Sequence, residues 1–190
     1  SGLWTFSTLG WPEETADLKL YHPTALLETG YDILFFWVAR MVLMSGFLLG
    51  EVPFKNVYLH GLVRDGQGRK MSKSLGNIIN PLDMIEKYGA DAVRLSLIMG
   101  ASPGNDLRLD ENRIRGYKHF ANKIWNITRF VLSQENTGEL KPELIKELDE
   151  LTKDVTKDIE EYRIDLAADR LYHYIWGRFA AEIIEESKGK

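Results

Sequence analysis

Residues 25–63, ALLETGYDILFFWVARMVLMSGFLLGEVPFKNVYLHGLV, decide the fold. A short apolar run at 25–28 ends at a Thr-Gly pair, and the periodicity that follows predicts a helix over about 32–49. The run 57–63 is rich in β-forming residues and predicts a second strand. Because a strand, a helix and a strand in this order form a crossover between parallel strands, the segment predicts an α/β sheet.

The run 33–49 is the most apolar part of the chain. It is close to the lower length limit for a membrane span, but it contains Arg40, Ser45 and Gly46. We therefore predict that it is a buried helix of the protein core and that the protein has no membrane contact.

The chain after residue 80 is expected to be mostly helical. Asn80 is the expected N-cap of a helix that has Pro81 at its first position and ends at Gly89. A further helix is expected over 91–99. The small, turn-forming stretch 101–105 then marks the expected domain boundary.

Three amphipathic helices are expected between about residues 110 and 187. Pro142 suits the first turn of the second helix, Asp165 is the expected cap of the third, and the polar stretch 133–139 is the expected linker between the first two. The apolar stripes are Ile114, Tyr117, Ala121, Ile124, Thr128 and Val131, then Leu144, Leu148, Leu151, Val155, Ile159 and Tyr162, then Ala168, Leu171, Ile175, Phe179 and Ile183. The expected architecture is an α/β domain over 1–104 followed by a helical bundle over 105–190.

The composition of the 190 residues limits the function classes. A net charge of -4 and a pI near 5.6 argue against a generally basic nucleic-acid coat, although a local basic face remains compatible with nucleic-acid contact. Cysteine is absent and the 4 histidines lack metal-ligand spacing, so neither a disulfide nor a protein-bound metal is expected. The first residues do not form a signal peptide and are typical of the middle of a longer chain.

The stretch 68–74, GRKMSKS, carries the clearest chemical signal. Lys70 and Lys73 provide two positive charges, Ser72 and Ser74 provide hydroxyl groups, and flanking glycines allow the segment to move. This combination is typical of a loop that grips a polyphosphate. A solvated basic turn is the other interpretation that these residues leave open.

The carboxyl ends of the two predicted strands carry further candidates, because ligands bind at these ends of an open α/β sheet. Gly30 allows a ligand to approach closely, and the Asp32 carboxylate beside Thr29 can accept hydrogen bonds from ribose hydroxyls. His60 and Gly61 can lie beside a flat base at the end of the second strand. The structural alternatives are that Asp32 caps its helix and that His60 is a core histidine.

Two more groups of residues have both a functional and a structural interpretation. Ile33 and Trp37 lie one helical turn apart and could wall a small apolar pocket, or they could simply pack in the core. Basic side chains on the first helix after residue 110 could meet nucleic-acid phosphates or form a solvated face. These basic residues are Arg113, Arg115, Lys118, Lys123 and Arg129.

Together these residues resemble a known family. The run 70–74 matches the Lys-Met-Ser-Lys-Ser signature of class I aminoacyl-tRNA synthetases, and its flanks at 60–63 and 75–77 resemble the isoleucine, leucine and valine subgroup. Isoleucyl enzymes typically carry Gly-x-Asp-Gln where this chain has Gly-Tyr-Asp-Ile at 30–33. The runs that resemble the valyl-tRNA synthetases are 9–12, 29–34, 37–41 and 101–106. The resemblance covers nearly the whole chain and weakens after about residue 133.

The resemblance implies an ATP-using ligase. It would activate valine to valyl-adenylate with release of pyrophosphate and then transfer the valyl group to tRNA(Val), with Mg²⁺ accompanying ATP as substrate. Lys73 would stabilise the charge that develops on the phosphates, assisted by Lys70 and the serines 72 and 74. The implied ribose contacts are Thr29, Gly30 and Asp32, the implied base contacts are His60 and Gly61, and the implied valine pocket is Ile33 and Trp37.

The resemblance also implies a fragment. Residues 1–104 would be the C-terminal half of a Rossmann-type nucleotide-binding domain, and 105–190 would be the first helices of an anticodon-binding domain. The family's His-x-Gly-His element and its editing domain have no counterpart in the sequence, so the fragment alone is expected to be inactive and unable to proofread. The parent is expected to be a monomeric, cytoplasmic enzyme. An isoleucyl-type fragment and a helical tRNA-binding or protein-binding module with a vestigial ATP loop are the alternatives.

Overall fold

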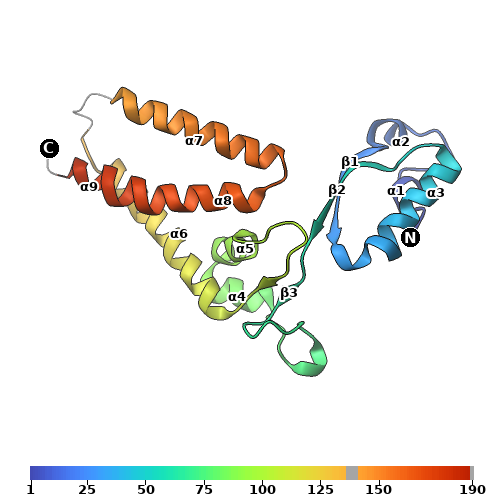
Figure 1. Ribbon diagram of the computed structural model, residues 1–190, viewed down its shortest axis with the longest axis horizontal. Helices are drawn as coiled ribbons and strands as arrows, with labels where there is room; N and C mark the ends of the chain where they lie inside the picture. The colour runs from blue at the N-terminus through green and yellow to red at the C-terminus, as the bar shows by residue number, and fades with distance from the viewer. Residues whose placement is uncertain (136–140, 189–190) are drawn as a thin grey trace. The chain divides into compact units, whose positions relative to one another are not determined.

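The computed structural model describes residues 1–135 and 141–188 and contains two compact units. The first unit comprises residues 1–62 with 103–106, and the second comprises 63–102 with 107–190. Figure 1 shows the elements of both units. The expected domain boundary falls within 103–106, a segment that belongs to the first unit, and the division into domains at residue 104 stays a prediction.

The first unit is built on the predicted crossover. β1 (Thr24–Gly30) and β2 (Phe54–His60) lie side by side (Figure 1). They are parallel, and their register pairs Gly30 with His60. α3 (Ala39–Leu49) lies between them in the chain and ends at Gly50, which has a left-handed conformation. The carboxyl ends of the two strands therefore lie side by side, as predicted. The short helices before β1 are α1 (Trp4–Ser7) and α2 (Ala16–Tyr21).

The predicted helix 32–49 does not begin as an α-helix. Tyr31–Ile33 forms a 3-10 turn, Leu34–Val38 forms a π-helical turn, and regular α-helix starts only at Ala39. A π turn is wider than an α turn and is frequent at functional sites. Apolar periodicity carries no information about this change of hydrogen-bonding pattern, so the sequence could not predict it.

The prediction that this helix is buried is wrong for one of its sides. Val38 and Met41 pack with Leu27 in the core of the first unit, whereas Phe35 is 76% and Phe47 is 84% exposed. The reason is geometric, because a two-stranded sheet covers one side of a helix only. By length and composition alone, Tyr31–Leu49 is also long and apolar enough to cross a membrane.

The predicted strand 57–63 is split in two. β2 ends at His60, and Val63–Arg64 forms β3, which pairs in parallel with β4 (Leu107–Arg108) in the second unit. Between them the chain leaves the first sheet, and the Leu62 N–H donates a hydrogen bond to the Asp106 carboxylate at 2.8 Å. A continuous run of β-forming residues does not reveal such a change of partner.

The helices of the second unit confirm most predicted ends. α4 (Pro81–Tyr88) is capped by Asn80, whose side chain accepts a hydrogen bond from the Leu82 N–H at 3.1 Å. α5 (Ala90–Ile98) follows, and α6 (Glu111–Leu132) begins after Asp110, whose side chain accepts from the Arg113 N–H. Their shared core contains Ala92, Val93, Leu109 and Ile114.

The last helices are α7 (Pro142–Glu160), α8 (Ile164–His173) and α9 (Ile184–Ser187), with a π-helical segment at Tyr174–Ile183 between the last two. The π-helical segment moves the buried positions from the predicted Phe179 and Ile183 to Ala180 and Ile184. The predicted cap at Asp165 is wrong. Its carboxylate accepts from the Arg163 guanidinium at 2.9 and 3.0 Å, which holds it inside the first turn. Most of the predicted linker, including Gly138, lies outside the described residues. The predicted fold class, α/β followed by helices, is confirmed.

Candidate functional site

The ends of β1 and β2 bring several predicted residues together in the first unit. A Cβ atom on Gly30 would lie 2.7 Å from Asp32 Oδ1 and 3.5 Å from the His60 ring, so a larger residue here would push the Asp32 carboxylate out of its present position. Thr29 is buried beside them. Asp32 lies in the first turn and Gly30 is the N-cap residue, which excludes the alternative in which Asp32 caps the helix.

His60 is exposed, so the core-histidine alternative is wrong. Its Nδ1 atom is 2.8 Å from the Gly61 carbonyl oxygen and its Nε2 atom is 3.3 Å from Glu28 Oε1. Gly61 has a clear structural reason as well, because a Cβ atom there would lie 1.8 Å from the Asn105 carbonyl oxygen. Contact of these residues with a nucleotide base stays a prediction.

The two predicted pocket residues differ in their surroundings. Trp37 packs against the core cluster of the first unit, and its ring centroid is 6.2 Å from that of Trp4. Ile33 is 37% exposed at the end of the 3-10 turn. Trp37 therefore has a structural role whatever its ligand contacts, while Ile33 is open to a ligand.

The loop of residues 70–76 lies in the second unit, after β3. Lys70 forms an antiparallel bridge with Arg64, and a single 3-10 turn spans Lys73–Leu75. The Ser72 side chain accepts from the Leu75 N–H at 3.3 Å, and Gly76 ends the turn with a left-handed conformation. The loop thus contains a folded, exposed turn, and its contact with a polyphosphate stays a prediction.

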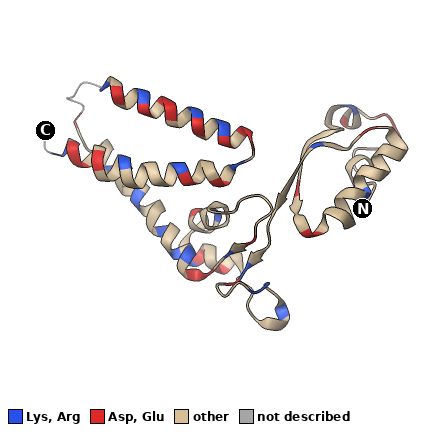
Figure 2. Cartoon of the chain, viewed as in Figure 1, with Lys and Arg blue, Asp and Glu red and all other residues tan. Residues whose placement is uncertain are grey.

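The lysine ammonium groups of this loop are open to a ligand. The Lys70 and Lys73 side chains are exposed, and neither ammonium group has a carboxylate or hydrogen-bond partner within the described parts of the chain. The neighbouring Arg69, by contrast, is paired with Asp65 at 2.8 Å. Figure 2 shows the basic residues of this loop, at the end of a projecting segment. Two unpaired cations on one loop are suited to an oligophosphate anion.

Two residues that sequence reasoning missed support the loop. The Asp65 carboxylate is buried and accepts hydrogen bonds from the Arg69 backbone and from the Asn77 side chain. These bonds, with that from Asn77 the largest cause, lower the pKa of Asp65 to about 2. An Asp-Gly pair such as that at 65–66 is typical of a turn, but nothing in the sequence links it to Asn77.

The basic residues of α6 make contacts within the second unit. Arg113 donates to the carbonyl oxygens of Ser96 and Met99 at the end of α5, and Lys118 donates to the Lys87 carbonyl. The Lys123 ammonium lies 4.3 Å from the Trp176 ring centroid. Arg113 therefore has a structural role, and contact of the basic residues of α6 with nucleic-acid phosphates stays a prediction.

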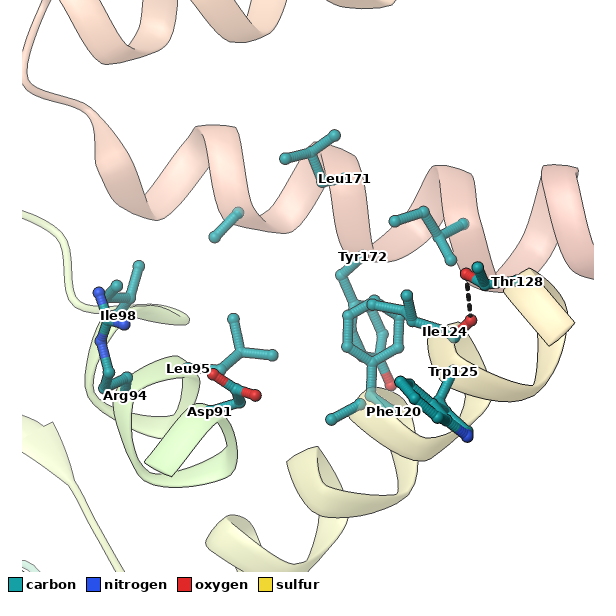
Figure 3. A pocket seen from close by; sticks show the side chains of 13 residues that line it. Asp91, Arg94, Leu95, Ile98, Phe120, Ile124, Trp125, Thr128, Leu171 and Tyr172 are labelled. Atoms are coloured by element: carbon teal, nitrogen blue, oxygen red, sulfur yellow. Dashed lines mark hydrogen bonds between the residues drawn. The ribbon is translucent and has the colours of Figure 1, made fainter. Parts of the chain in front are cut away.

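A pocket of about 530 Å³ lies between α5, α6 and α8 (Figure 3). Its lining is mainly apolar, with the aromatic side chains of Phe120, Trp125 and Tyr172 among it and Asp91 and Arg94 at one side. It contains none of the predicted site residues. In residues 1–135 and 141–188 we find no group of three or more His, Cys, Asp and Glu side chains that could hold a metal ion.

Two protein families match the sequence. Residues 1–110 match the tRNA synthetases class I (I, L, M and V), and residues 142–190 match the anticodon-binding domain of tRNA ligase. Among curated relatives, the valine–tRNA ligases of Petrotoga mobilis, Thermotoga maritima and Clostridium tetani are 51%, 49% and 46% identical over 100%, 99% and 99% of this chain. The chain spans 23% of the length of each of these relatives.

Solved structures agree on the fold. Methionyl-tRNA synthetase of Mycobacterium tuberculosis, in complex with methionyl-adenylate, matches 87% of this chain with a TM-score of 0.72 and 27% identity, over 35% of its own chain. The ternary complex of agnB2 LeuRS, tRNA and LeuAMS from Agrobacterium radiobacter K84 matches 91% with a TM-score of 0.73 and 21% identity, over 26% of its own chain. The likeness to the second shows the fold alone.

Proposed function

Since the chain belongs to the class I tRNA synthetases of the isoleucine, leucine, methionine and valine group, we propose that it works as part of a valine–tRNA ligase. The observation that carries this proposal is the pair of exposed, unpaired ammonium groups of Lys70 and Lys73 on one loop, with Lys73 on its folded turn. Identity of 46–51% with valine–tRNA ligases favours valine over isoleucine as the amino acid.

The loop would act on the first step of the reaction. An oxygen of the valine carboxylate attacks the α-phosphorus of ATP, the new P–O bond forms, and the bond to the bridging oxygen of the β-phosphate breaks. Negative charge then grows on the departing pyrophosphate. Lys73, with Lys70 and the hydroxyls of Ser72 and Ser74, would stabilise that charge, and Mg²⁺ would accompany ATP as part of the substrate.

The predicted residues of the first unit would hold the remaining parts of the substrates. Asp32 is exposed next to Gly30, so its carboxylate can accept hydrogen bonds from the ribose hydroxyls, with Thr29 beside it. The exposed His60 ring would lie against the adenine base above Gly61. The valine methyl groups would contact Ile33 and Trp37.

The second step would transfer the valyl group from the adenylate to the terminal adenosine of tRNA(Val), releasing AMP. The match of residues 142–190 to an anticodon-binding domain supports tRNA as the partner of α7 and α8. We propose further that the whole protein is a soluble, monomeric enzyme of the cytoplasm that needs neither a membrane nor a protein-bound metal.

The proposal is tested by valine-dependent exchange of pyrophosphate into ATP, measured on the whole protein. Lys73→Ala is expected to lower the exchange rate by about 100-fold or more, because one donor to a developing anion is lost. Lys153→Ala, which removes an exposed lysine of α7, is the matched control. Equal rates in Lys73→Ala and the control would contradict the role of the loop.

The amino acid is tested in the same assay with valine, isoleucine, leucine and methionine in turn. We expect valine to give the highest value of kcat/KM. A preference for isoleucine would replace the valine assignment with an isoleucine–tRNA ligase. Exchange with none of the four, in a folded protein, would leave a binding module as the better description of the chain.

A further inference from the structure

The Asn77 side chain forms hydrogen bonds with three residues of the segment 65–77, which contains the two lysines. Its Oδ1 atom accepts a hydrogen bond from the Ser72 N–H at 2.9 Å. Its Nδ2 atom donates to Asp65 Oδ2 at 2.9 Å and to the Lys70 carbonyl oxygen at 3.3 Å. The orientation of the amide is fixed by these partners, since the opposite one would place Oδ1 against a carboxylate.

Asp65 is itself held in place on its other side. It accepts from the backbone N–H groups of Gln67 at 3.0 Å and Arg69 at 2.8 Å, and from the Arg69 side chain at 2.8 Å. The residue is 7% exposed. The hairpin between β3 and Lys70 therefore presents a fixed carboxylate oxygen to Asn77.

The bond from Ser72 to Asn77 closes the base of the turn that carries Lys73. Ser72 precedes the 3-10 turn and Gly76 follows it, so the two ends of the turn are brought together next to Asn77. Without this closure, the turn would keep the bonds from the Leu75 N–H to the hydroxyl and carbonyl oxygens of Ser72, from the Gly76 N–H to the Lys73 carbonyl oxygen, and between the Ser72 and Ser74 hydroxyls. All of these lie within the turn, so none ties it to the rest of the loop. The direction of the Lys73 side chain depends on the conformation of this turn.

We propose that Asn77, held by Asp65, is a positioning residue that sets the direction of Lys73 toward the ATP phosphates. Asn77 has no amide hydrogen left for a phosphate oxygen in this arrangement, because Nδ2 donates to Asp65 and to the Lys70 carbonyl oxygen. It acts on the phosphates only through the turn. The inference rests on the proposed function, in which Lys73 stabilises the departing pyrophosphate.

The test is pyrophosphate exchange by the whole protein with Asn77→Ala. We expect kcat to fall by about 10- to 100-fold, as for other losses of alignment, with the KM for valine unchanged. Asn126→Ala, an exposed asparagine of α6, is the matched control. A wild-type kcat in a folded Asn77→Ala protein would overturn the proposal.

A double-mutant cycle with Lys73→Ala separates positioning from general stability. If Asn77 acts through Lys73, Asn77→Ala has no further effect on exchange once Lys73 is gone. Full additivity of the two losses would overturn the proposal. An undiminished rate in Lys73→Ala alone would instead overturn the proposed function, so the two failures are distinguishable.

Asn77→Asp is a second variant that keeps the size of the side chain. It keeps the acceptor for the Ser72 N–H but sets a carboxylate oxygen against Asp65 and the Lys70 carbonyl oxygen in place of the donor. We expect kcat to fall at least tenfold, about 1.4 kcal/mol. A folded Asn77→Asp variant with the wild-type kcat would overturn the proposal.

Discussion

The low pKa of Asp65 makes the stability of the second unit depend on pH. The pKa of about 2 lies below the value of about 3.9 that an unfolded aspartate has, so Asp65 stabilises the fold when it is ionised. The stabilisation is fully present above about pH 4 and is lost as the pH falls through about 2. The cause is chiefly the hydrogen bond from Asn77, with further bonds from Arg69.

Asp65→Asn is therefore expected to lower the urea midpoint at pH 6, and its difference from the unsubstituted chain should shrink as the pH falls from 4 toward 2. Other carboxylates titrate in both proteins, so they cancel in the comparison. A difference that stays constant over this range would contradict the assignment.

Gly61 gives a second prediction for a single residue. A methyl group at this position would meet the Asn105 carbonyl, which belongs to the backbone and cannot rotate away. Gly61→Ala is expected to destabilise the first unit by about 1–3 kcal/mol or more. Gly46→Ala is the control, since nothing lies within 4 Å of its Cβ position in α3, and it should gain about 0.5–1 kcal/mol. Thermal unfolding of both variants measures the two changes in stability. Equal changes in Gly61→Ala and Gly46→Ala would contradict the crowding at Gly61.

Single residues of the site differ in how well the sequence reveals them. Lys70 to Ser74 could be predicted because the signature is contiguous and its residues share one chemistry. Asp65 and Asn77 could not, because each alone is an ordinary turn residue, and their bond exists only when the loop has folded. The crowding at Gly61 comes from a segment more than 40 positions away in the sequence, which no local pattern encodes.

Among the helices, α5 depends on a side chain from α6. Arg113 donates from its guanidinium to the Ser96 and Met99 carbonyl oxygens at the end of α5, where helix carbonyl groups need partners from outside the helix. Arg113→Ala is expected to cost about 1.5–3 kcal/mol, the usual range for hydrogen bonds to a charged group.

The control for this prediction is Arg115→Ala, because Arg115 is exposed and bonds to Asn112 of its own helix. It should change stability by less than about 0.5 kcal/mol. Urea unfolding of both variants measures the difference. Equal losses of unfolding free energy in Arg113→Ala and Arg115→Ala would contradict a stabilising contact between Arg113 and α5.

The sequence predicts the ends of the helices better than their interiors. Asn80 with Pro81, and Gly50, marked their ends correctly because caps are local chemistry. The π-helical segments at 34–38 and 174–183 were not predicted. A π turn differs from an α turn in which backbone groups form hydrogen bonds, and the residue types do not reveal this difference. The cap prediction at Asp165 failed because its side chain pairs with Arg163, and this pairing is visible only in the folded structure.

For the whole molecule, each unit has a core cluster of its own. Met41 is fully buried in the first unit and Ile114 is fully buried in the second. Met41→Ala is expected to cost about 2–5 kcal/mol and to lower hydrogen-exchange protection in β1 and β2. Ile114→Ala should instead lower protection in α5 and α6. If each variant lowered protection equally in both units, the chain would unfold as one cooperative body.

The exposed ammonium groups of Lys70 and Lys73 also govern how the protein responds to its solvent. With no internal counter-charge among the described residues, they draw counter-ions from solution, and a Debye length of about 8 Å at physiological ionic strength already weakens their reach. Sulfate or phosphate buffers would compete with a nucleotide for the same turn, whereas chloride would do so far less. The choice of buffer anion will therefore shift any affinity measured at this loop.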